Sequence, residues 1–125
     1  MNHLLILGLS LIIPVISIDI VQNQRLTEVE VTQKLQNLPG WEQQGKTLVY
    51  THTFNNFIES VNFVNCLVEP AETLGHHPDL SISYNKVTIN LTTHDAFGLT
   101  DLDFQLADKI NQIIDSWTSQ TTCLN

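Results

Sequence analysis

The sequence predicts an α+β domain, a four-stranded antiparallel sheet with three helices packed on one face, in the order α-β-β-α-β-β-α. Helical periodicity between capping and stop residues predicts helices within 27–38, 56–74 and 100–117. Alternating apolar and polar residues around a short turn predict two β-hairpins, at 41–54 and 80–94. The 125 residues have the length of one such domain, which we place at residues 25–118.

The first and last helices each begin with a capping box. Thr27 is followed three residues later by Glu30, and Thr100 is followed by Asp103, so that hydroxyl and acid can bond reciprocally to the backbone. Pro39-Gly40 ends the first helix. The residues expected to face the sheet are Val31, Leu35 and Leu38 in the first helix and Leu106, Ile110, Ile113 and Trp117 in the last.

The middle helix contains a proline. Pro70 lacks an N–H donor and its ring clashes with the carbonyl four residues earlier, so we expect a kink between residues 66 and 70. The apolar stripe expected to face the sheet comprises Phe57, Val61, Val64, Val68 and Ala71.

The two hairpins set the positions of three histidines. The first turns near Gln44-Gly45-Lys46, with Leu48, Tyr50 and Phe54 on one face, and His52 is expected to be exposed or at the sheet edge. The second is expected to turn at Asn85-Lys86, which would pair Tyr84 with Val87 and His77 with His94. Opposed residues of an antiparallel pair have Cβ atoms about 4.5–5.5 Å apart, so this register would place two imidazoles side by side.

The charge balance excludes one class of partner. Five Lys and Arg residues stand against thirteen Asp and Glu, a formal net charge of −8, so the surface repels phosphate backbones and no direct nucleic-acid binding is expected. The chain has no glycine-rich phosphate loop, and we expect no cofactor. Cys66 and Cys123 belong to no metal-binding or redox spacing, so Cys66 is predicted to be a buried free thiol in preference to a disulfide partner.

The segments outside the domain are an apolar leader or extension at 1–24 and a polar tail at 119–125. The apolar run from Leu4 to Ile18 has the length of a signal-peptide core, but no Lys or Arg precedes it and no small-residue cleavage site follows. Two interpretations stay open: a targeting or membrane-associating segment, or an over-long start or apolar extension packed on the domain. We expect the domain in the cytoplasm, with export or membrane association through residues 4–18 as the alternative.

His76, His77 and His94 are the candidate catalytic residues. An imidazole has an unperturbed pKa of about 6.5, which suits proton transfer near neutral pH, and the acids Glu72 and Asp79 lie nearby in the sequence. The alternative is that His76 and His77 only cap the helix end. A zinc site with three histidine ligands is disfavoured because adjacent extended residues point to opposite faces, and no nucleophile motif surrounds Ser81 or Ser83.

The stretch "AETLGHHPDLSISYNKVTINLTTHDAFGLTDLDFQLADKI" closely resembles the pterin-4a-carbinolamine dehydratase (4a-hydroxytetrahydrobiopterin dehydratase) family. The shared pattern is an acid before His-His-Pro, then an aromatic residue, a histidine and an aspartate; its members here are Glu72, His76, His77, Pro78, Tyr84, His94 and Asp103. Weaker similarity extends over residues 26–117. The sequence departs from the family at Pro70 and at Phe97, where a glycine commonly precedes Gly98 and where the phenyl ring could narrow the pocket mouth.

The resemblance implies dehydration of 4a-hydroxytetrahydropterin to quinonoid dihydropterin, in tetrahydrobiopterin recycling, with His76, His77 and His94 as the acid/base groups. Asp103 would orient a histidine or cap the last helix. The resemblance also implies a homodimer or homotetramer, and a non-catalytic dimerisation or assembly factor is the alternative function. The residues predicted to bind the pterin are Glu72, Pro78, Asp79, Thr93, Asp95 and Asp103.

Overall fold

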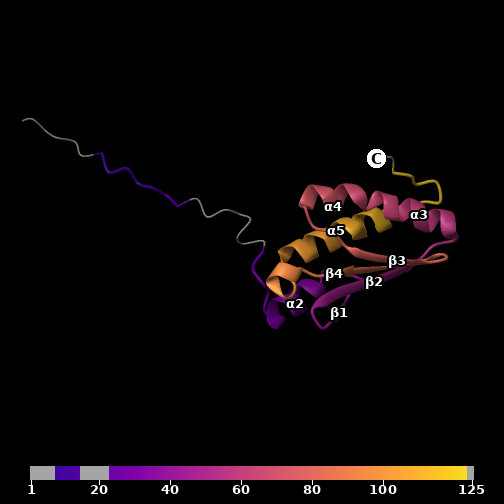
Figure 1. The fold of residues 1–125 in the computed structure, drawn as a ribbon, viewed down its shortest axis with the longest axis horizontal. Coiled ribbons are helices and arrows are strands. Elements are labelled where there is room, and N and C mark those ends of the chain that lie inside the picture. Colours follow the sequence, from indigo (N-terminus) through magenta and orange to yellow (C-terminus); the bar gives the residue numbers. More distant parts are fainter. Residues whose placement is uncertain (1–7, 15–22, 124–125) are drawn as a thin grey trace, which may run out of the picture.

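The computed structural model describes residues 8–14 and 23–123 (Figure 1). One antiparallel sheet has the strand order β1-β2-β4-β3, with β1 at Glu42–Gln44, β2 at Thr47–Thr53, β3 at Asp79–Ser83 and β4 at Lys86–Leu91. The helices are α2 (Glu28–Leu35), α3 (Phe57–Cys66), α4 (Val68–Leu74) and α5 (Asp101–Asp115), and a 3-10 helix, η1 (His94–Ala96), precedes α5. This architecture confirms the predicted α+β fold and element order, with the middle helix divided into α3 and α4.

The core lies between one face of the sheet and the helices. Leu48 of β2 pairs with Leu91 of β4, and both are fully buried, as are Val87 and Ile89 on the same face of β4. Figure 1 shows α3, α4 and α5 lying across this face. The helices contribute Val31, Phe63, Leu67, Leu106 and Ile110 to the same cluster.

Both predicted capping boxes are confirmed. Thr27 N–H donates to Glu30 Oε2 at 2.8 Å, and Thr100 N–H donates to Asp103 Oδ2 at 2.9 Å. The predicted kink is confirmed as a helix break at Leu67, which places Pro70 in the first turn of α4. Its missing N–H costs nothing there, because the first four N–H groups of a helix have no intrahelical partner.

The predicted buried stripe of the middle helix is right only in part: Ala71 is buried and the half-buried Val64 packs against the core. Phe57 and Val68 are exposed, whereas Phe63 and Leu67 are buried. The helix has apolar residues on two faces, and the spacing at 57, 61, 64 and 68 follows a stripe between these faces, half-buried at 61 and 64 and exposed at 57 and 68.

The predicted register of the second hairpin is also wrong. Ser83 pairs with Lys86 and Ile82 with Val87, so the loop is Tyr84-Asn85 and not Asn85-Lys86. Tyr84 adopts φ +55°, and a positive φ at the first loop position suits the twist of a two-residue hairpin. Moving the loop by one residue shifts the partner of each β3 residue by two positions along β4. Side chains alternate between faces with a period of two, so each stays on its predicted face.

The predicted pairing of His77 with His94 is wrong as well, because the two strands are shorter than the prediction required. β3 begins at Asp79 and β4 ends at Leu91, so neither histidine belongs to a strand. His94 instead opens the 3-10 helix η1.

Cys66 and Cys123 form a disulfide across a sequence separation of 57 residues, which corrects the prediction of a free thiol at Cys66. Beyond α5, the Thr121 N–H donates to the Thr118 carbonyl at 2.9 Å, and this turn redirects the tail. In Figure 1 the C-terminal segment lies beside the end of α3, where Cys66 is the last residue. The polar tail is therefore tied covalently to the helical layer.

Of the two positions expected for His52, exposed or at the sheet edge, the second is found: His52 is half-buried, pairs with Val87 of β4, and lies beyond the part of β2 that pairs with β1. Its ring centroid lies 4.5 Å from that of Phe54 and 6.2 Å from that of Tyr50, and Tyr50 Oη lies 3.2 Å from His52 Nδ1. Burial lowers the pKa of His52 below its usual value.

Residues 4–7 and 15–18 of the apolar N-terminal run lie outside the described residues. Residues 8–14 form neither helix nor strand, and within the described parts of the chain no helix is long and apolar enough to cross a bilayer. The leader at 1–24 therefore stays a prediction.

Candidate functional site

A left-handed glycine positions His76 and His77. Gly75 ends α4 with φ +59°, its N–H donates to the Glu72 carbonyl at 3.1 Å, and the His76 N–H donates to the Ala71 carbonyl at 3.0 Å. This pair of bonds is a Schellman motif, which reverses the chain at the helix end and favours glycine at the turning residue. The two histidines therefore lie between the end of α4 and the start of β3.

A closed loop positions His94. Beyond β4, the Thr93 N–H donates to the Gly98 carbonyl at 3.1 Å and the Gly98 N–H donates to the Thr93 carbonyl at 3.4 Å. The six residues between and including these two form one small loop that contains η1. His94 is its first helical residue and is exposed.

The three histidines meet at one cavity of about 330 Å³. The structure thus brings together His76, His77 and His94 although their predicted strand pairing is wrong. Thr93 and Asp95, both predicted to bind the pterin, also line this cavity. The remaining lining residues are Asn23, Gly75, Thr92 and Leu102.

His76 is the most firmly held of the three. Its Nε2 lies 2.7 Å from Asp103 Oδ1, and its exposed fraction is 9% while that of Asp103 is 0%. A carboxylate can only accept hydrogen bonds, so a hydrogen lies on Nε2, and in the neutral imidazole the lone pair is on the other ring nitrogen, Nδ1. Asp103 therefore fixes both the orientation and the tautomer of His76.

Asp103 has further partners, which hold it in place. Its Oδ2 accepts hydrogen bonds from the Thr93 hydroxyl at 2.8 Å and from the Thr100 N–H at 2.9 Å. The Thr93 and Thr100 hydroxyl oxygens lie 2.8 Å apart, which extends the chain of hydrogen bonds. Asp103 thus caps α5 and positions His76 at once, so both functions that the sequence offered for it are present in the geometry.

His77 and His94 are held more loosely. His77 Nε2 lies 2.6 Å from Glu72 Oε1, but both side chains are exposed, and solvent screens this pair. Among the described residues, no hydrogen bond to the His94 ring is found. The cavity therefore has one rigid buried imidazole and two accessible ones.

Four of the predicted binding residues do not line this cavity: Glu72, Pro78, Asp79 and Asp103. Asp103 lies behind His76, and Glu72 contacts His77 and lines another cavity. Pro78 lines that same apolar cavity between α4 and β3, and Asp79 is exposed at the start of β3. Sequence reasoning missed Thr92 and Leu102, which gave no signal beyond proximity to Thr93 and Asp103, and it assigned Thr100 only a capping role. Within the described residues, no group of three His, Cys, Asp or Glu side chains is arranged to hold a metal ion.

The fold and this cavity define an α+β protein with histidines gathered at one end of an antiparallel sheet. The family model for pterin 4 alpha carbinolamine dehydratase matches residues 24–113, and the chain belongs to that family. A relative from Nostoc punctiforme is 54% identical over 90 residues, which are 72% of this chain and 97% of the relative. A relative from Cyanothece sp. is 51% identical over 94 residues, which are 75% of this chain and 97% of the relative. Both have the provisional name pterin-4-alpha-carbinolamine dehydratase.

Solved structures agree with this assignment. A transcriptional coactivator/pterin dehydratase from Brucella melitensis superposes with a TM-score of 0.69 at 35% identity, over 72% of this chain and 98% of that one. A pterin dehydratase-like protein identified as a RuBisCO assembly factor has a TM-score of 0.53 at 22% identity, over 62% of this chain and 93% of that one, and shares the fold. Family membership supports a pterin carbinolamine dehydratase activity for the chain.

Proposed function

We propose that this protein dehydrates 4a-hydroxytetrahydropterin to quinonoid dihydropterin and water, as a hydro-lyase of tetrahydrobiopterin recycling. The observation on which this proposal rests is the convergence of His76, His77 and His94 on one cavity in a chain of the dehydratase family. The proposed reaction needs proton transfers and no change of oxidation state, so imidazoles are sufficient for it.

The reaction breaks the C4a–O and N5–H bonds and forms the O–H bond of water and the second bond between C4a and N5. The C4a–O bond breaks and the hydroxyl group leaves as water after an acid donates a proton to it. A base removes the proton from N5, whose electron pair completes the C4a=N5 double bond. One proton is donated and one is removed, so the total number of protons on the histidines is unchanged. Proton exchange between the two groups or with solvent then restores the acid and the base for the next turnover.

The different anchoring of the histidines supports a division of tasks. His76, buried and held by Asp103, presents a fixed Nδ1 lone pair, while His77 and His94 are accessible at the cavity. We assign the two proton transfers to this trio, with Thr93 and Asp95 as neighbouring binding groups. Glu72 supports His77, and Asp103 supports His76.

The test is a turnover assay on the full chain with 4a-hydroxytetrahydropterin. General acid and base groups contribute about 10²–10⁴-fold each, so His77→Ala combined with His94→Ala should lower kcat by at least about 10²-fold. His52→Gln is the matched control, because His52 is a half-buried histidine that does not line the cavity. Wild-type kcat in the double variant would refute the catalytic assignment.

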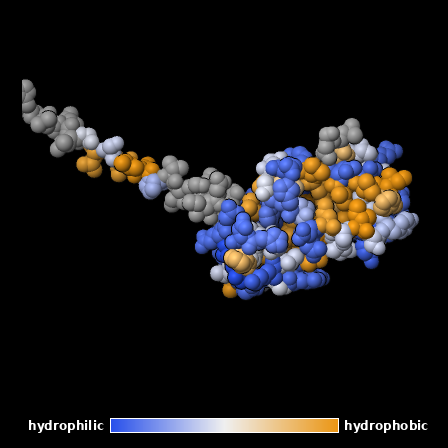
Figure 2. All heavy atoms as spheres, viewed as in Figure 1, coloured by the Kyte–Doolittle hydropathy of each residue, from blue (hydrophilic) through white to orange (hydrophobic). Residues whose placement is uncertain are grey.

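We further propose that two copies of the chain associate through the α3–α4 patch, defined as Phe57, Ile58 and Val68. These side chains are 53%, 69% and 41% exposed, and Figure 2 shows apolar atoms gathered over this part of the domain. The neighbouring edge strand β3 is exposed along its length, and an unpaired edge beside an apolar patch suits a self-complementary two-fold contact.

Light scattering after size exclusion tests this association. Ile58→Glu should shift the protein to the monomer, because it would bury an unpaired charge in the contact. Val29→Glu is the control, since Val29 is 66% exposed on α2, outside the patch. A wild-type monomer at micromolar concentration, or equal shifts in both variants, would contradict the proposal.

The disulfide favours export over a cytoplasmic location. Disulfides such as Cys66–Cys123 persist in oxidising compartments and are rare in the reducing cytosol. Cell fractionation with thiol alkylation tests this choice: we expect the protein in an exported fraction with both cysteines protected. Alkylation of both cysteines in freshly lysed cells, with the protein in the cytosolic fraction, would restore the cytoplasmic assignment.

A further inference from the structure

Phe97 combines an unfavourable backbone conformation with an exposed apolar side chain. It follows η1 with φ +55° and ψ 35°, in the left-handed region, and its side chain is 72% exposed. A left-handed conformation costs a residue with a Cβ atom about 1–2 kcal/mol. Glycine would relieve that cost, and no burial of the phenyl ring offsets it.

The left-handed conformation alone does not indicate a site. Tyr84 has the same φ of +55° and is 67% exposed, but it is the first residue of a two-residue hairpin loop, where a positive φ fits the strand twist. Phe97 differs from Tyr84 in its surroundings, because it lines a cavity and Tyr84 lines none of the cavities described above.

The cavity beside Phe97 adjoins the histidine site. It has a volume of about 280 Å³ and shares Thr92, Thr93 and His94 with the histidine cavity. Lys46, Thr47 and Gly98 complete its wall. A substrate whose reacting ring lies against the histidines can therefore extend a substituent past His94 toward Phe97.

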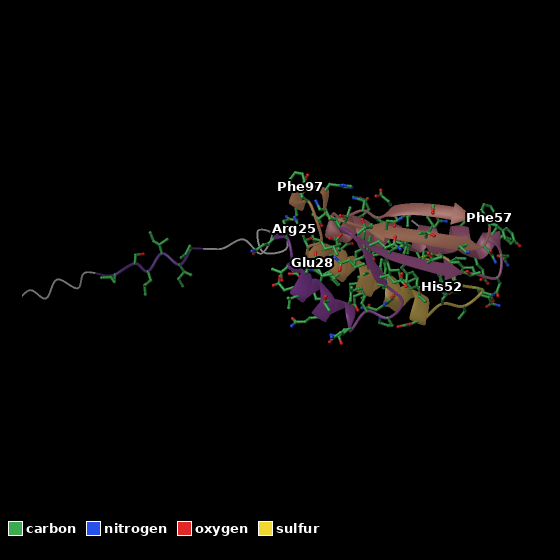
Figure 3. The ribbon with its side chains drawn as sticks, turned by 90° about the horizontal axis from the view of Figure 1, so that it is seen from below. Arg25, Glu28, His52, Phe57 and Phe97 are labelled. Carbon is green, nitrogen blue, oxygen red and sulfur yellow. A yellow bond between two sulfur atoms is a disulfide. The ribbon has the colours of Figure 1, made fainter. Side chains whose placement is uncertain are left out.

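Backbone hydrogen bonds fix the main chain of the loop that carries Phe97, whose N–H donates to the His94 carbonyl at 3.0 Å. The two hydrogen bonds between Thr93 and Gly98 close the loop on both sides of Phe97. A Cβ atom at Gly98 would lie 2.8 Å from Arg25 Nε, so the glycine allows the Arg25 side chain to pack against the loop. In Figure 3, Arg25 and Phe97 lie at the same end of the domain, opposite His52 and Phe57.

We propose that Phe97, with Lys46 and Thr47, forms a subsite that selects pterins with a hydroxylated side chain; this inference rests on the proposed dehydratase function. The phenyl ring supplies an apolar wall for the carbon chain of the substituent. The Lys46 ammonium group and the Thr47 hydroxyl are donors for its oxygen atoms, and neither side chain makes a hydrogen bond or ion pair within the described residues. A methyl substituent is too short to use these groups.

The experiment compares wild type, Phe97→Gly and Tyr84→Gly on two substrates. One is the 4a-hydroxy derivative of a 6-methyl tetrahydropterin, and the other is that of tetrahydrobiopterin, which has a dihydroxypropyl group. Both variants should gain stability, because glycine tolerates the left-handed conformation. Only Phe97→Gly should lower kcat/KM for the dihydroxypropyl substrate, by about tenfold through KM, with the methyl substrate unchanged.

Turnover of the methyl substrate by the wild type tests the proposed function separately from the subsite. Equilibrium binding of biopterin and 6-methylpterin, followed by pterin fluorescence, measures the subsite even without turnover. The wild type should prefer biopterin, and Phe97→Gly should lose that preference while Tyr84→Gly keeps it. Equal effects of Phe97→Gly on both ligands, or no preference in the wild type, would overturn the subsite.

Discussion

Replacing Asp103 by asparagine should change the tautomer of His76. The carboxylate accepts three hydrogen bonds, from His76 Nε2 at 2.7 Å, the Thr93 hydroxyl at 2.8 Å and the Thr100 N–H at 2.9 Å. An amide has one oxygen and one NH₂ group, so it cannot accept on both sides. With its oxygen toward the two threonines, its NH₂ group would donate to Nε2 and move the imidazole hydrogen to Nδ1.

The size of the effect follows from these contacts. A hydrogen bond to a charged group contributes about 1.5–3 kcal/mol and a neutral one about 0.5–1.5, so three bonds losing their charge should reduce the free energy of unfolding by about 3 kcal/mol. His76 would also present an N–H group where the wild type presents a lone pair. We expect kcat to fall by about 10²-fold or more, the range of one lost acid or base.

Nitrogen NMR of the imidazoles and turnover kinetics measure the two effects together. The matched control is Glu30→Gln, the same chemical change in the capping box of α2, where no histidine is bound. It should leave kcat unchanged. An Asp103→Asn protein that retains hydrogen on Nε2 of His76 and a kcat within about twofold of wild type would refute the positioning role.

Two further predictions concern stability. Cys123→Ser should lower the free energy of unfolding by about 4 kcal/mol, the chain-entropy value for a loop closed across 57 residues, and reductant should lower the wild type equally without affecting the variant; identical urea midpoints with and without reductant would contradict this. His52 has a pKa lowered by burial, so the unfolded chain binds the proton first as the pH falls, and stability should decrease below about pH 6.5. This decrease should be smaller in His52→Gln when unfolding is measured from pH 8 to pH 5, and parallel pH profiles for the two proteins would contradict it.

Features set by neighbouring residues could be predicted from the sequence. The capping boxes at Thr27 and Thr100 depend on side chains three residues apart, and the break at Leu67 follows from the missing donor and the ring of Pro70. Each is decided within a single turn of helix. The element order follows from these signals and from the strand alternation, so the fold class was predicted in full.

Features that depend on two distant segments could not be predicted in the same way. The disulfide requires the tail beyond α5 to turn back to the end of α3, and no spacing of Cys66 and Cys123 contains that information. The stripe of the middle helix was misassigned because that helix has apolar residues on two faces, and periodicity cannot tell which face meets the sheet. The side left exposed is the α3–α4 patch, where we propose a second copy binds.

The site was predicted through the wrong geometry. The expected pairing of His77 with His94 placed both on strands, whereas a Schellman turn at Gly75 presents His77 and a loop closed by Gly98 presents His94. The predicted hairpin still placed the chain before β3 close to the chain after β4, because β3 and β4 are neighbours whichever two residues form the loop. The predicted loop was displaced by one residue along the chain. The observed loop begins at Tyr84, whose left-handed φ fixes the register of the hairpin.

The two capping boxes show how a folding signal and a functional one can share a residue. Glu30 closes its box on an exposed surface, where the longer side chain has room to accept directly from the cap N–H. Asp103 closes its box with 0% exposure and has the His76 ring at 2.7 Å on its other oxygen. In a close-packed interior one extra methylene costs about 1–3 kcal/mol, so the shorter acid leaves room for the imidazole. Capping alone would accept either acid, and the burial of a histidine against the carboxylate is the physical reason for aspartate at this position.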